Sequence, residues 1–143
     1  MFEKLFKKKA HLNTGSNYSL IGALLIHAAK MDNNYTENEK NMIRKAITHL
    51  SAKPDEEIDQ IFKLAEEKER KSNQIIEFTK EIKKKDMKYR IKIIEILWRI
   101  VYSDGTADVY ETNLIRRING LLYVSDRVSG EIKEKIRKEL FKP

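Results

Sequence analysis

Three acidic residues in the second half of the chain have the types and the spacing of a cation site. Asp104, Asp108 and Glu111 lie at relative positions 0, +4 and +7, across a predicted loop that leads into a helix. Carboxylate and loop carbonyl oxygens are the ligands that Ca²⁺ and Mg²⁺ prefer. Asp104 also ends a predicted helix, where the exposed carbonyl groups disfavour an anion. A divalent cation, Ca²⁺ or Mg²⁺, would offset that cost.

Helix capping explains part of the same pattern without a metal. Asp108 and Glu111 have the spacing of a capping box, in which the first side chain accepts from a helical N–H and the glutamate reaches back. Backbone N–H groups at the start of the next helix could likewise stabilise Asp104. Capping and cation binding therefore both remain open. The spacing is not that of an EF-hand, whose oxygen ligands alternate over a loop of about twelve residues.

The acidic corner occurs twice. The segments 24–32 and 96–104 match at an offset of 72 residues, which also pairs Asp32 with Asp104 and Glu39 with Glu111. Asp32 and Glu39 are thus the candidate ligands of a first site. This copy carries less charge, because Asn and Thr side chains replace residues of the second loop; they are Asn33, Asn34 and Thr36. Thr36 and Glu39 again form a capping box, so the first corner is expected to be the weaker site, or structural only.

The elements that position these corners are predicted to be helices. Apolar residues recur at helical spacing, and the chain of 143 residues has only two prolines and five glycines. Thr36 and Asp86 are expected N-caps, and Pro54 is expected at the first position of a helix. Ser72 could cap a shorter fourth helix, and the last helix is expected to start near Ser125 or Asp126. The fold class is therefore all-α: one domain over residues 16–143, a bundle of about seven helices with an internal pseudo-twofold duplication.

Composition narrows the cellular setting. The chain has no cysteine, which excludes disulfides and thiol chemistry, and no apolar stretch long enough to span a membrane. No signal peptide is recognisable, so a cytoplasmic location with possible membrane association is expected. The oligomeric state is not determined by the sequence. The net charge of +7 is unevenly distributed, with basic segments at both ends and over residues 80–92.

The basic leader, residues 1–15, is a candidate for contact with an anionic membrane. Its apolar side chains could share one face of a short amphipathic helix beside a group of lysines, in the set Phe2, Lys4, Leu5, Phe6, Lys7, Lys8 and Lys9. A terminus without fixed structure is an equally good interpretation.

The run from Lys80 to Lys92 contains seven basic and two acidic side chains. It could contact nucleic-acid phosphates, but it has no interleaved aromatic residue apart from Tyr89. A solvated helix face is the preferred interpretation, and nucleic acid is not an expected partner. The three histidines form no ligand pattern, and His27 is expected in or beside the core. No catalytic residue is recognised, so the chain is not expected to be an enzyme.

The same residues carry a family resemblance. The segment 97–105, followed by Asp108, Glu111 and the segment 114–118, resembles the second half of TerB-like (tellurite-resistance protein B) domains, and the likeness extends over about residues 18–135. The resemblance implies an all-helical fold from a duplicated unit, a protein partner, and a role in tellurite or stress response near the cytoplasmic membrane, without catalysis. It also implies metal sites at the acidic corners, formed here by Asp32, Glu39, Asp104, Asp108 and Glu111.

Overall fold

The computed structural model describes residues 17–72, 74–104 and 109–141, and confirms the all-α class. The side chains of Asp32 and Asp104 are not among the parts described. The elements follow a first helix over residues 17–29, and they are η1 (Lys30–Asp32), α2 (Glu37–Ser51), α3 (Asp55–Lys71), α4 (Ile75–Thr79), η2 (Ile82–Lys84), α5 (Met87–Val101), η3 (Tyr102–Asp104), α6 (Val109–Leu121) and α7 (Asp126–Leu140). No strand occurs in the described ranges.

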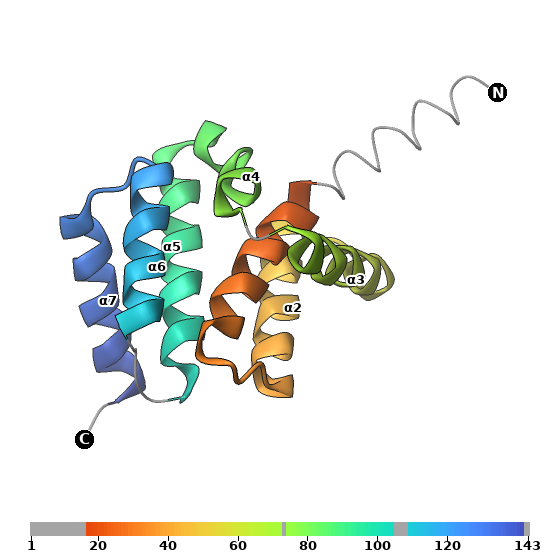
Figure 1. Ribbon diagram of the computed structural model, residues 1–143, viewed down its shortest axis with the longest axis horizontal. Helices are drawn as coiled ribbons and strands as arrows, with labels where there is room; N and C mark the ends of the chain where they lie inside the picture. The colour runs from red at the N-terminus through yellow and green to blue at the C-terminus, as the bar shows by residue number, and fades with distance from the viewer. Residues whose placement is uncertain (1–16, 73, 105–108, 142–143) are drawn as a thin grey trace.

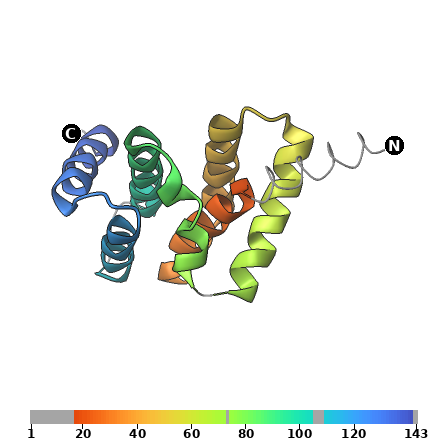
Figure 2. The ribbon, with the colours of Figure 1, turned by 90° about the horizontal axis from the view of Figure 1, so that it is seen from above.

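The helices form two groups that share one core. Helices α5, α6 and α7 pack against one another on one side, while the first helix, α2 and α3 form the other side (Figures 1 and 2). The groups meet where α2 packs on α5. No helix in the described part of the chain is both long and apolar enough to cross a membrane.

The first helix and α5 supply the centre of the core, as their apolar patterns predict. The first helix buries every apolar side chain between Ile21 and Ala29, and α5 buries one broad face that includes Ile94, Leu97 and Ile100. Trp98 of α5 is also buried, and its indole N–H donates to the Ser129 hydroxyl of α7 at 3.1 Å. This bond satisfies the polar atom of the largest core side chain and fixes α7 against α5.

Side-chain caps are found at three helix starts, two of them, Thr36 and Asp86, as predicted. Thr36, Asp86 and Ser125 each accept a hydrogen bond from the backbone N–H three residues later. Pro54 lies one residue before its predicted place: it is the N-cap of α3, which begins at Asp55. Ser72 follows the end of α3 rather than capping the next helix, because α4 begins only at Ile75.

The secondary structure repeats with the offset of the sequence. The first helix ends at residue 29 and α5 at residue 101, each runs into a three-residue 3-10 turn, and α2 and α6 begin at residues 37 and 109. Each of these boundaries is separated from its counterpart by the same 72 positions. The local structure of the two halves is therefore alike, while a twofold relation between them in space remains a prediction.

Candidate functional site

The first corner is built from η1, a left-handed residue and the start of α2. Asn33 has φ 61°, a conformation that asparagine tolerates better than most residues, and it turns the chain out of η1. The capping box then begins α2. Glu39 N–H donates to Thr36 Oγ1 at 3.1 Å, and Thr36 N–H donates to Glu39 Oε1 at 3.0 Å. Thr36 Oγ1 also donates to the same carboxylate oxygen, at 3.1 Å.

Through these hydrogen bonds, Glu39 stabilises the start of α2. Its side chain is buried, with 6% of the residue exposed, and a buried carboxylate is costly unless hydrogen bonds compensate it. The capping interpretation therefore accounts for Glu39 as the sequence suggested. Its expected companion Asp32 lies in η1, but its side chain is outside the described parts, so the pair stays a prediction as a cation site.

The second corner lies between the end of α5 and the start of α6. The α5 helix passes into η3, which ends at Asp104, and α6 begins at Val109. Glu111 lies in the first turn of α6 and is buried, with 3% of the residue exposed. Asp108 and the Asp104 side chain lie outside the described residues. The structure thus establishes the burial of one expected ligand, Glu111, and the bounds of the elements on either side of residues 105–108.

The two corners lie at the same end of the bundle (Figure 1). The η1 turn of the first corner also packs against α6, the helix that follows the second corner. Among the described residues, no group of three or more His, Cys, Asp or Glu side chains could hold a metal ion. Asp108 and the Asp104 side chain are not among the described parts, so a cation site at the second corner stays a prediction.

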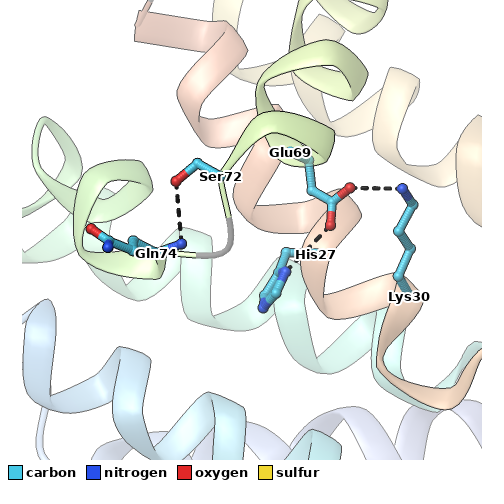
Figure 3. Close-up of polar contacts among 5 residues, drawn as sticks. All are labelled: His27, Lys30, Glu69, Ser72 and Gln74. Atoms are coloured by element: carbon cyan, nitrogen blue, oxygen red, sulfur yellow. Dashed lines mark hydrogen bonds and ion pairs between the residues drawn. The ribbon is translucent and has the colours of Figure 1, made fainter.

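The sequence missed one buried charge cluster, which is centred on Glu69. The stretch around Glu69 reads as a solvated face, yet only 6% of this residue is exposed. Its Oε2 accepts from Lys30 Nζ at 2.7 Å, and its Oε1 lies 3.4 Å from His27 Nδ1 (Figure 3). Beside it, Ser72 Oγ accepts from Gln74 N–H at 3.3 Å in the turn that leaves α3. The sequence feature that could have indicated this cluster is the three-residue spacing of His27 and Lys30, which places them on one helix face.

Tyr35 extends the charged region from Glu69 toward α2. Its hydroxyl group is buried and has no hydrogen-bond partner among the described residues. Burial, together with the nearby carboxylate of Glu66, raises the pKa of Tyr35 well above its usual range. Lys30 and Lys40 lie 5.7 and 5.1 Å from its ring centre. The phenol thus stays neutral between charged neighbours, and the cluster ties the first helix, α2 and α3 together.

The other residues that the sequence singled out are those of the leader, the basic run after α4, and His27. All seven proposed membrane contacts of the leader precede residue 17 and lie outside the described residues. The basic run after α4 is described, and its lysines at positions 80, 83, 84, 85 and 88 are exposed. His27 lies at the edge of the core, bonded to Glu69, as its predicted place required.

Taken together, the fold and its corners define a small all-helical domain with two acidic helix–loop–helix turns at one end. The family model described as Tellurite resistance protein TerB matches residues 19–134, which is most of the chain, and the chain belongs to that family. Searches of curated proteins and of solved structures found no match.

Proposed function

We propose that this TerB-family domain is a non-enzymatic module that binds a divalent cation, Ca²⁺ or Mg²⁺, at its second corner. The burial of Glu111 in the first turn of α6 is the observation that favours this proposal. In the sequence, Glu111 follows Asp104 by seven positions and Asp108 by three. A cation held between these groups would neutralise an anion at a helix C-terminus and a buried carboxylate at once.

The first corner serves as the internal comparison. Its Glu39 has the equivalent place, and one of its carboxylate oxygens accepts two hydrogen bonds from Thr36. The first corner has Thr36 where the second has Asp108, so it supplies one charged ligand fewer. We therefore assign the principal site to the second corner and a capping role to the first.

Calorimetric titration of Ca²⁺, Mg²⁺ and Mn²⁺ into the full chain tests the proposal. The Asp104→Asn variant should bind at least 10-fold more weakly than the unsubstituted chain, since it loses a charged ligand. Asp32→Asn is the matched control at the equivalent position and should change the affinity little. Flat titrations of the unsubstituted chain, or equal losses in both variants, would contradict the site.

We also propose that a protein partner in the tellurite or stress response contacts this end of the domain. Val109 and Tyr110 are 70% and 71% exposed at the start of α6, and large exposed apolar side chains commonly mark contact surfaces. A photo-crosslinking residue placed at position 110 should capture a discrete partner in cells exposed to tellurite. The same residue placed at Lys135 on α7 should not. Capture from both positions, or from neither, would argue against this contact.

A further inference from the structure

A group of exposed lysines lies at the end of the bundle opposite the acidic corners. Lys80, Lys83, Lys84, Lys85 and Lys88 follow one another through the end of α4, η2 and the start of α5, and every one is exposed. This segment, residues 76–88, is here named the basic edge. It lies where α5 begins, whereas the second corner lies where α5 ends (Figure 1).

The positive charge of the basic edge is only partly neutralised. Its acidic residues are Glu77, Glu81 and Asp86. Glu81 pairs with Lys84 at 3.5 Å, and Asp86 accepts the Tyr89 N–H at 2.9 Å as the cap of α5. In contrast, the described residues supply no ion-pair partner to the lysines at positions 80, 83 and 88. Three ammonium groups are therefore available to an external anion.

Apolar side chains are exposed within the same segment. Ile76 is 63% exposed on α4, and Met87 is 45% exposed at the first position of α5. Ile76, Lys80 and Lys83 line one shallow hollow together with Asn17, the first described residue of the first helix. The first described residue of the first helix therefore lies beside the basic edge.

We propose that the basic edge docks on an anionic lipid membrane. Lysine ammonium groups would contact lipid headgroups while their long stems and the Ile76 and Met87 side chains enter the boundary with the acyl chains. Nucleic acid fits this surface less well. The exposed side chains include neither an aromatic platform for bases nor an arginine fork for paired contacts, and phosphates offer nothing to exposed Ile and Met. The surface does not depend on the cation site at the other end.

Sedimentation of the full chain with vesicles tests this proposal. Vesicles of phosphatidylcholine containing phosphatidylserine are compared with pure phosphatidylcholine at physiological ionic strength. The triple variant Lys80→Gln, Lys83→Gln, Lys88→Gln removes the three unpaired ammonium groups. Each lysine near an anionic surface contributes roughly a factor of five, so the triple variant should bind about 100-fold more weakly. The leader remains in every variant, so differences report on the basic edge.

A charge-matched control separates this surface from net charge. Lys45, Lys63 and Lys135 are exposed lysines on α2, α3 and α7, and changing them to Gln lowers the net charge equally. This control should keep most of the vesicle binding. Ile76→Ser should weaken binding several-fold without altering the thermal unfolding, because Ile76 is not in the core.

Four results would overturn the proposal. If the chain does not sediment with anionic vesicles, no such surface exists. If the two triple variants lose binding equally, only the overall charge matters; if neither loses binding, the leader alone is responsible. Tighter binding to duplex DNA than to vesicles, lost on the same three substitutions, would reassign the basic edge to nucleic acid.

Discussion

The substitution Gly22→Ala should destabilise the domain although alanine is the better helix former. Gly22 lies inside the first helix, where it faces α3 at close range. A Cβ added there would meet the Ala65 Cβ at 2.8 Å and Ile47 Cδ1 at 3.2 Å. Carbon atoms prefer about 3.5–4.0 Å, so the first helix and α3 would have to separate by more than half an ångström. Ile47 can rotate its terminal methyl group away, but Ala65 can move only with its backbone.

Two opposing effects decide the magnitude. Alanine gains about 1 kcal/mol of helix propensity over glycine, while overpacking a buried site costs typically 1–3 kcal/mol. The neighbouring residues Ala23, Leu24 and Leu25 are fully buried, so the first helix cannot shift without disturbing the core. We expect a net loss of about 1 kcal/mol in the free energy of unfolding, and a lower Tm by about 2–4 °C.

Gly130→Ala is the matched control. Gly130 lies inside α7, and an added Cβ meets nothing within 4 Å. Only the propensity term applies, so this variant should gain up to about 1 kcal/mol. Urea unfolding followed by circular dichroism at 222 nm measures both variants. A Gly22→Ala protein that gains as much as Gly130→Ala would refute the steric reasoning. In a double-mutant cycle, Ala65→Gly should restore part of the loss, with a favourable coupling free energy.

Three further predictions concern the buried charge, a cap and a phenol. Glu69→Gln should cost about 2 kcal/mol of unfolding free energy, because Lys30 and His27 lose a buried carboxylate, whereas exposed Glu67→Gln should show no measurable change. Thr36→Ala should cost about 1 kcal/mol by removing the cap of α2, as judged by urea unfolding. Burial raises the pKa of Tyr89 to about 12, so the unfolded chain deprotonates first and stability should fall from pH 10 upward. Tyr89→Phe should flatten that fall in urea midpoints between pH 9 and 11.5.

The parts of the fold that local chemistry determines were predictable. The caps at Thr36 and Asp86 were read correctly, because each bond joins residues three positions apart. The apolar residues that nearly encircle the first helix, and the apolar-rich sequence of α5, likewise identified the centre of the core. The end of α4 was harder to predict from the sequence. Ile82 continues the apolar spacing of α4 but lies in a separate 3-10 turn and is buried there. Periodicity alone does not distinguish these two arrangements.

At the candidate site, too, local sequence patterns do not reveal contacts between residues that are distant in the sequence. The partners of Glu69 are 39 and 42 positions away in sequence, so its burial depends on how α3 crosses the first helix. Within a run of charged residues, nothing in the local pattern separates Glu69 from exposed Glu67. The acidic corners were visible because their members are close in sequence. Their occupancy by a cation remains a prediction, since spacing is equally consistent with capping.

The opposite ends of α5 can act independently, and their separation gives the reason. The helix has 15 residues, which corresponds to a length of about 22 Å between the basic edge and the second corner. The Debye length at physiological ionic strength is about 8 Å, so charges at one end are largely screened from the other. Changing the lysines at positions 80, 83 and 88 to Gln should therefore leave the cation affinity within about twofold, while Asp104→Asn should leave vesicle binding intact. A larger cross-effect in titrations at physiological salt would mean that α5 transmits a conformational change between the two ends.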